Sequence, residues 1–137
     1  MIDAERDRIL VVDDEIKMCA TLKRFLEGNH YAVEVAHDGE DALEKLERFL
    51  PRCVIMDIRM PVRNGIETLK VIKSTRPGTE VIMTTAITNE SQAQECLGLG
   101  ACDFIFKPIR LAELLEKVRK ALRSRRESDG KPAPERT

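Results

Sequence analysis

The chain alternates short apolar runs with amphipathic stretches, and this alternation occurs five times. Four of the runs are interpreted as continuous apolar strands, which are typical of a parallel sheet that helices cover on both faces. The second run carries Glu34 at its centre, and a charge there favours an edge strand. The five predicted strands are Ile9 to Val12, Ala32 to Ala36, Cys53 to Met56, Val81 to Thr85 and Phe104 to Phe106.

The stretches between the runs show the spacing of amphipathic helices. Gly28-Asn29 is expected to end the first helix, and Asp38 to cap the second. The fourth helix, over 89–98, has only a sparse apolar face. The predicted faces are, in chain order, Ile16, Cys19, Leu22 and Leu26; Leu43, Leu46 and Leu50; Ile66, Leu69 and Ile72; Ala93, Cys96 and Leu97; and Leu111, Leu114, Leu115, Val118 and Leu122.

Alternating strands and helices with short links predict right-handed crossovers and a parallel sheet. We therefore expect an α/β fold, a flavodoxin-like doubly wound sheet of five parallel strands with five helices. The strand order 2-1-3-4-5 is favoured because the second strand is predicted to lie at an edge. Residues 127–137 are polar and lack apolar periodicity, which indicates a flexible tail or linker after a domain that spans 1–126.

Composition indicates an ordinary globular protein. The chain has 137 residues and a formal net charge of −1, so no overall field favours nucleic acid or an anionic membrane. Four cysteines without a C-x-x-C pair are interpreted as structural thiols, and His30 and His37 as isolated surface residues. The charged N-terminus does not resemble a signal peptide, and no apolar run approaches the length of a membrane span. A reducing cytoplasm is the expected location.

Reactive side chains follow the predicted strands. Asp13 and Asp14 follow the first strand, Asp57 the third and Lys107 the fifth, while Thr85 closes the fourth. The carboxyl ends of parallel strands share one edge, where doubly wound sheets bind their ligands. Each residue also has a plainer interpretation: an N-cap, a turn residue, a strand residue or a solvated lysine. Those separate readings do not explain why three acids, a hydroxyl and a cation share one edge.

Converging carboxylates repel one another, and a hard cation such as Mg2+ removes that conflict. An aspartate beside the metal can then attack phosphorus and form an acyl phosphate. Lys107 can neutralise the phosphoryl charge, and the Thr85 hydroxyl with a backbone N–H can hold its oxygens. The residues are therefore sufficient for phosphoryl acceptance.

The same residues form a motif set that resembles the receiver domains of two-component response regulators, over roughly Arg8 to Arg123. Each segment alone is weak, but the set is highly specific. The segments are Ile9-Leu10-Val11-Val12-Asp13-Asp14-Glu15, Asp57-Ile58-Arg59-Met60-Pro61-Val62-Arg63-Asn64-Gly65, Thr84-Thr85-Ala86, Gly100-Ala101-Cys102-Asp103-Phe104 and Phe106-Lys107-Pro108.

The resemblance implies that Asp57 is the phosphoacceptor. By the same resemblance, the donor would be a phosphohistidine on a sensor histidine kinase or a phosphotransfer protein. Mg2+ would be held by Asp14 directly, by Asp13 largely through water, by Asp57 and by the backbone carbonyl of Arg59. The domain would promote its own phosphorylation and slow dephosphorylation without being an enzyme in any further sense. Arg59 and Ile87 occupy the positions that tune dephosphorylation in this family, and neither can orient an attacking water.

The resemblance also implies how the signal leaves the site. Lys107, through a cis peptide to Pro108, would pair with the phosphoryl group, while Thr85 and the Ala86 N–H would bind its oxygens. Thr85 would then be coupled to Phe104, three positions before the lysine. The surface of the fourth helix, fifth strand and fifth helix would change and control an output domain, a partner or a second copy of the chain.

Three competing functions have less support. A phosphohydrolase of similar fold usually has a second acid two residues after its nucleophile, where this chain has Arg59. A binding module that signals without phosphate would not need the complete set of acids and lysine, and a flavin site would need a phosphate loop after the first strand. The cations near the C-terminus are interpreted as helix-dipole partners rather than a nucleic-acid site. The output remains open between a DNA-binding domain, an ATPase domain and a stand-alone receiver.

Overall fold

The computed structural model describes residues 6–60 and 63–130, with side chains described up to residue 124. All five predicted strands are present, and their bounds lie within one residue of the prediction. The elements are β1 (Arg8–Val12), α1 (Ile16–Gly28), β2 (Ala32–Ala36), α2 (Gly39–Phe49), β3 (Cys53–Asp57), α3 (Gly65–Thr75), β4 (Glu80–Ala86), the 3-10 helix η2 (Ile87–Asn89), α4 (Glu90–Gly98), β5 (Asp103–Lys107) and α5 (Leu111–Gly130).

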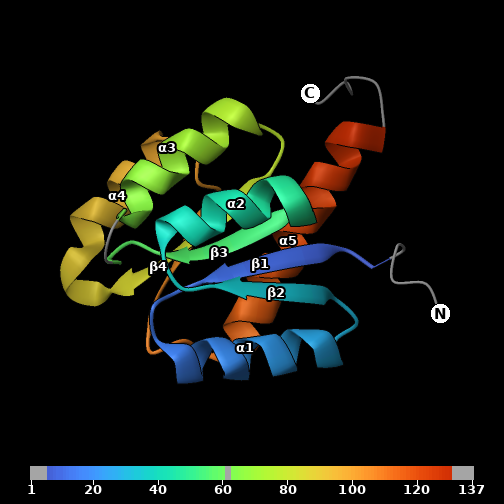
Figure 1. Cartoon of the computed structure of the whole chain (residues 1–137), viewed down its shortest axis with the longest axis horizontal. Helices are drawn as coiled ribbons and strands as arrows, with labels where there is room; N and C mark the ends of the chain where they lie inside the picture. The colour runs from blue at the N-terminus through green and yellow to red at the C-terminus, as the bar shows by residue number, and fades with distance from the viewer. Residues whose placement is uncertain (1–5, 61–62, 131–137) are drawn as a thin grey trace.

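The strands form one parallel sheet in the order β2-β1-β3-β4-β5, which confirms the predicted topology and the edge position of β2. All five residues of the central strand β3 are buried. The strand arrows point the same way in Figure 1, so their carboxyl ends lie along one edge of the sheet. Among the described residues, none of the helices combines the length and apolar character that a membrane span requires.

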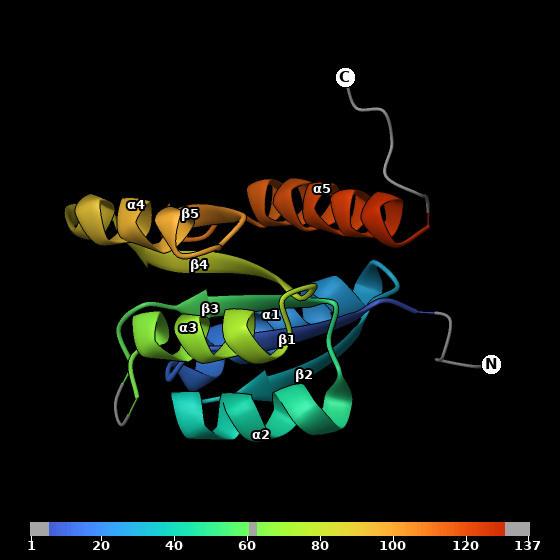
Figure 2. The same cartoon turned by 90° about the horizontal axis from the view of Figure 1, so that it is seen from above.

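Side chains alternate along each strand, so the sheet has two buried faces. Ile9 and Val11 of β1 pack with residues of α1 and α5 on one face. Leu10 and Val12 pack with residues of α2, α3 and α4 on the other face. Figure 1 shows α2 in front of the sheet and α5 behind it, and Figure 2 shows these layers from above. Because helices cover both faces, polar chemistry is confined to the ends of the strands.

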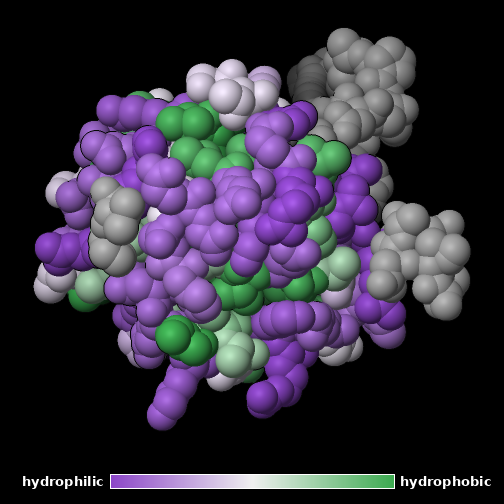
Figure 3. Space-filling model, viewed as in Figure 1, coloured by the Kyte–Doolittle hydropathy of each residue, from purple (hydrophilic) through white to green (hydrophobic). Residues whose placement is uncertain are grey.

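The predicted helix faces are correct in their centres and wrong at two ends. Ile16 and Leu50 were expected in the core but are 68% and 46% exposed. Ile16 is the first residue of α1, and Leu50 follows α2 in a left-handed conformation (φ 54°) that breaks the helical period. Figure 3 shows a mainly hydrophilic face with small, separate apolar patches. Asp38 caps α2 as predicted, since its side chain accepts a hydrogen bond from the Asp41 N–H.

The last helix is longer than the predicted domain. α5 continues as a helix to Gly130, into the segment that was expected to form a tail. The last core residue of the described part of α5 is Leu122. The remainder of the predicted tail, 131–137, lies outside the described residues, and the boundary at residue 126 stays a prediction.

Gly65 allows α3 to begin directly beside the end of β3. Its N–H donates to the Ile58 carbonyl at 2.8 Å. A Cβ at this position would lie 2.3 Å from the carbonyl oxygen of Asp57, which is far inside van der Waals contact. The loop after β3 therefore folds back tightly against the backbone of Asp57, and only a residue without a side chain fits there.

We predict that Gly65→Ala lowers the free energy of unfolding in urea by about 1–3 kcal/mol, because overpacking forces the backbone at Asp57 to move. Gly98→Ala is the matched control, since both glycines lie in helices and nothing lies within 4 Å of a Cβ built at Gly98. The control should be neutral or slightly stabilising. Equal unfolding curves for the two variants would contradict the close approach.

Candidate functional site

The sheet brings the predicted acids together at its carboxyl edge. Asp13 follows β1 directly, Asp14 is the next residue, and Asp57 ends β3. One carboxylate oxygen from each of the three acids lies within 4.8 Å of the others. Asp57 is separated from the other two acids by α1, β2, α2 and most of β3, so the meeting of the three depends on the order of the parallel strands.

The ammonium group of Lys107 lies between two of these acids. Its Nζ donates hydrogen bonds to Asp13 Oδ2 at 2.8 Å and to Asp57 Oδ2 at 3.0 Å. The side chains of the two acids are only 2% and 8% exposed. Removing charges from water to this extent is costly unless an opposite charge compensates. The peptide bond from Lys107 to Pro108 is cis, as the resemblance implies.

The pKa values of these groups reflect the same balance. Burial raises the pKa of Asp57, and the hydrogen bond and charge of Lys107 offset only part of that increase. Partial burial acts to lower the pKa of Lys107, but its hydrogen bonds to Asp13 and Asp57 outweigh this and leave the pKa raised. The lysine therefore stays a cation, and it is the group that makes ionised acids tolerable here.

Asp14 differs from the two buried acids. The N-cap residue of α1 is Glu15, and no side-chain hydrogen bond caps this helix end, so the N-cap interpretation of Asp14 is wrong. It is Asp13 that accepts from the Glu15 N–H, with Oδ1 at 2.9 Å. The exposed Asp14 side chain forms no hydrogen bond or ion pair with the residues that the structure describes. Its carboxylate is thus available to an incoming ligand.

β4 contributes a buried hydroxyl group to the same edge. Thr85 is 1% exposed, and its Oγ1 has no hydrogen-bond partner among the described residues. A buried hydroxyl without a partner is unfavourable, and such a group fits a site that receives an oxygen-bearing ligand. Ala86, the last residue of β4, is exposed. Phe104 is partly buried against the core face formed with α4, and its ring centroid lies 5.2 Å from that of Phe106.

The backbone of Asp13 is held by residues that the sequence did not connect with the site. His37 Nδ1 lies 3.0 Å from the Asp13 carbonyl oxygen, and Cys19 Sγ donates to the same oxygen at 3.3 Å. The Asp13 N–H donates to the carbonyl of Ala36. His37 is exposed, as predicted, but it is not isolated. Its place directly after β2, at the edge where the acids lie, was the one signal in the sequence that could have indicated this contact.

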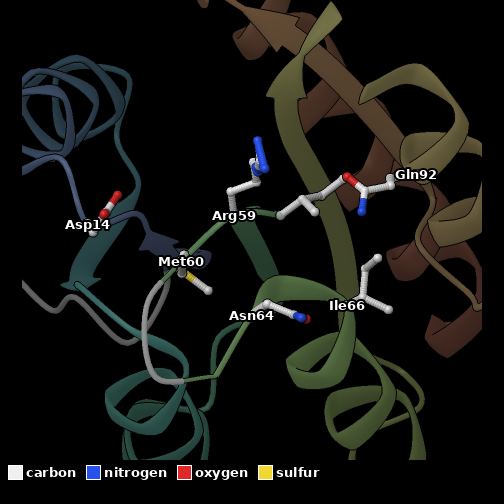
Figure 4. Close-up of a pocket in the computed structure, with 7 residues that line it drawn as sticks. Asp14, Arg59, Met60, Asn64, Ile66 and Gln92 are labelled. Atoms are coloured by element: carbon white, nitrogen blue, oxygen red, sulfur yellow. The ribbon is translucent and has the colours of Figure 1, made fainter. Parts of the chain in front are cut away.

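A pocket of about 510 Å³ adjoins the acidic cluster, and Figure 4 shows Gln92 of α4 on one side of it and Asp14 on the other. The Arg59 N–H donates to Asp57 Oδ1 at 3.3 Å, which keeps the start of the loop after β3 against the acid. The pocket is lined by Asp14, Ile58, Arg59, Met60, Asn64, Ile66 and Gln92.

The chemistry of this edge fits a hard divalent cation. Mg2+ binds carboxylate and carbonyl oxygens and retains several waters. Three carboxylates meet here, and one of them, on Asp14, is both exposed and unengaged by the described residues. The acidic cluster could therefore bind a metal ion next to a buried lysine and a buried hydroxyl.

A model of the response regulator receiver domain family matches residues 9–119. The chain belongs to this family. The match includes every acid of the cluster and Lys107, which pairs with two of them, so the candidate site lies within the receiver domain. The resemblance inferred from the motifs is confirmed.

Curated relatives of the receiver domain are longer proteins. This chain is 38% identical over 120 residues to the transcriptional regulatory protein ZraR of Salmonella typhimurium, and the aligned region covers 88% of this chain and 27% of ZraR. It is 37% identical over 126 residues to the response regulator MprA of Mycobacterium ulcerans, which covers 92% of this chain and 54% of MprA. The chain thus spans about a quarter to a half of the length of these relatives.

Solved structures have the same fold. The receiver domain of NtrX from Brucella abortus is 30% identical with a TM-score of 0.82, over 85% of this chain and 98% of that one. A CheY-like response regulator receiver domain protein from Methanospirillum hungatei is 31% identical with a TM-score of 0.86, over 90% and 99% of the two chains. The predicted fold class is therefore confirmed.

We predict that Lys107→Met, measured by urea unfolding in metal-free buffer, costs about 3 kcal/mol, because it leaves two buried carboxylates without a cation. Lys117→Met is the matched control. The Lys117 side chain is as exposed as that of Lys107, at 26% and 25%, and it also donates to the Phe104 carbonyl, but its acidic partners Asp103 and Glu113 are 32% and 39% exposed. The control should cost about 1 kcal/mol or less. Similar losses in the two variants would show that burial of the acids does not decide the effect.

Proposed function

We propose that this receiver domain is a phosphorylation switch in which Asp57 accepts a phosphoryl group from a sensor histidine kinase or phosphotransfer protein. The observation that carries the proposal is the Lys107 ammonium group, which is hydrogen-bonded to both Asp13 and Asp57 beside the exposed carboxylate of Asp14. Transfer to a carboxylate requires a nucleophile, a cation for the phosphoryl oxygens and a metal site, and this edge offers candidates for all three.

We propose Mg2+ as the metal of this site. Asp14 would bind it directly, Asp13 largely through water, and Asp57 and the backbone carbonyl of Arg59 would complete the protein ligands. When bound, the ion supplies positive charge that neutralises phosphoryl oxygens. The support is the donor set, in which an unengaged carboxylate lies beside two that already share one cation.

In the proposed transfer, the P–N bond of the donor phosphohistidine breaks and a P–O bond to Asp57 forms, while the electron pair of the broken bond stays on the imidazole nitrogen. Lys107 already contacts Asp57 and would pair with the arriving oxygens. The Thr85 hydroxyl and the Ala86 N–H would donate hydrogen bonds to the same group. The proposal for Thr85 is supported by its buried and unpartnered Oγ1.

Phosphorylation would be transmitted through Thr85 to Phe104 and to the surface of α4, β5 and α5. Only Ala93 and Cys96 of α4 are buried among its described side chains, so little packing energy opposes a shift of this helix. The changed surface would contact an output domain, a partner or a second copy of the chain. A cytoplasmic location, a domain over 1–126 with a linker after it, and no catalysis beyond the domain's own phosphorylation and slow dephosphorylation belong to the same proposal.

Asp57→Asn should abolish phosphorylation. Incubation with a small-molecule phosphodonor and Mg2+ should add the mass of one phosphoryl group to the wild-type chain, and chelation of Mg2+ should prevent it. Intact-mass spectrometry measures both results. Asp103→Asn, which changes a partly exposed acid of β5, should be phosphorylated like wild type. A mass increase that persists in Asp57→Asn would move the acceptor to another residue.

The phosphorylated state should persist far longer than seconds, because Arg59 and Ile87 lack the amide or carboxylate that orients an attacking water. Arg59→Asn should shorten the lifetime by introducing such an amide, which is measured as the decay of the phosphorylated mass after the donor is removed. Arg76→Asn, at the far end of α3, should leave the decay unchanged. A wild-type lifetime of seconds would refute this prediction.

A further inference from the structure

Asp13 and Asp14 are neighbours in the chain, but the structure holds them in opposite ways. The Asp14 side chain has no hydrogen-bond or ion-pair partner in the described part of the chain. Every polar atom of Asp13 has a partner, namely Ala36 for the N–H, His37 and Cys19 for the carbonyl, Glu15 for Oδ1 and Lys107 for Oδ2. The described contacts therefore act on Asp14 only through the backbone that precedes it, which sets the direction of its Cα–Cβ bond.

The carbonyl oxygen of Asp13 belongs to the peptide group that joins Asp13 to Asp14. A carbonyl oxygen has two lone pairs, and here Cys19 and His37 supply two donors from different elements. Because the carbonyl can only accept, the His37 ring carries its proton on Nδ1 in this contact. Cys19 lies on α1 and His37 directly follows β2, so the two hydrogen bonds fix this peptide group relative to both elements.

We propose that His37 is a positioning residue for the metal-binding acids. Its Nδ1–H holds the Asp13–Asp14 peptide group and thereby directs the Asp14 carboxylate toward the cation. The inference rests on the proposed function, since it assigns His37 a part in supporting the Mg2+ site described there. Residues that orient metal ligands from outside commonly govern metal affinity, because they reduce the freedom that the ligands would otherwise lose on binding.

The position of His37 makes this role separable from folding. Cys19 of α1 is buried in the core, so its removal would disturb packing as well as the hydrogen bond. His37 is exposed, and its described contact to the site is the one to the Asp13 carbonyl. A substitution at His37 should therefore change the site while leaving the core unchanged.

The test uses Mn2+ as the probe and the full chain without phosphodonor, with bound and free ion distinguished by electron paramagnetic resonance. His37→Ala should weaken Mn2+ binding about 3- to 10-fold, less than a direct partner of a ligand side chain would, because the effect passes through the backbone. The free energy of unfolding in urea should stay close to that of wild type. Competition experiments with Mg2+ should rank the wild-type chain and His37→Ala in the same order of affinity.

Two further variants separate positioning from a general surface effect. His37→Asn should restore most of the affinity, because the Asn side-chain amide N–H lies close to the place of the imidazole Nδ1–H and donates in the same way. His30→Asn changes the other histidine, an exposed residue whose φ of 76° Asn tolerates, and should leave Mn2+ affinity unchanged.

Each outcome decides the inference. Wild-type affinity in His37→Ala overturns the positioning role while the Mg2+ site stands. If His37→Asn does not restore the Mn2+ affinity, the positioning role is overturned. It is also overturned if the loss of affinity parallels a loss in the free energy of unfolding, because the role of His37 is then structural. Absence of Mn2+ binding by the wild-type chain removes the metal from the proposed function and this inference with it.

Discussion

The structure depends on one electrostatic constraint, which is that two carboxylates are buried at the end of a sheet whose faces are closed by helices. Asp13 and Asp57 can remain there because the Lys107 ammonium group is hydrogen-bonded to both. The compensation is incomplete, since the pKa of Asp57 stays raised. Three acids share one cation at this edge, so it attracts further positive charge beside Asp14.

Most of the fold could be predicted from the sequence, because a parallel strand buried on both faces appears as a continuous apolar run. Each predicted strand lies within one residue of its observed bounds, and the charge of Glu34 was enough to place β2 at an edge of the sheet. The acids and the lysine could also be placed, because carboxyl ends of parallel strands share an edge whatever the details of packing. Strong and repeated signals therefore carried this part of the prediction.

The failures have a different physical origin. Ile16 and Leu50 continue the apolar spacing past the point where helix and sheet still face each other, and periodicity does not show where that contact ends. The contact from His37 to the Asp13 carbonyl was missed because every residue has a backbone oxygen, so only the place of His37 directly after β2 indicated it. The alternative interpretation of Asp14 as a helix cap is wrong because Glu15 is the N-cap residue, and the Glu15 N–H donates to Asp13.

Lys107 lies in β5, the last of the five strands to be synthesised. A chain leaves the ribosome from its N-terminus, so both buried acids emerge well before the lysine that neutralises them. Until β5 joins β4, the partly assembled sheet carries two carboxylates whose mutual repulsion opposes their burial. A partly synthesised chain that lacks β5 therefore also lacks the cation that the two buried acids share.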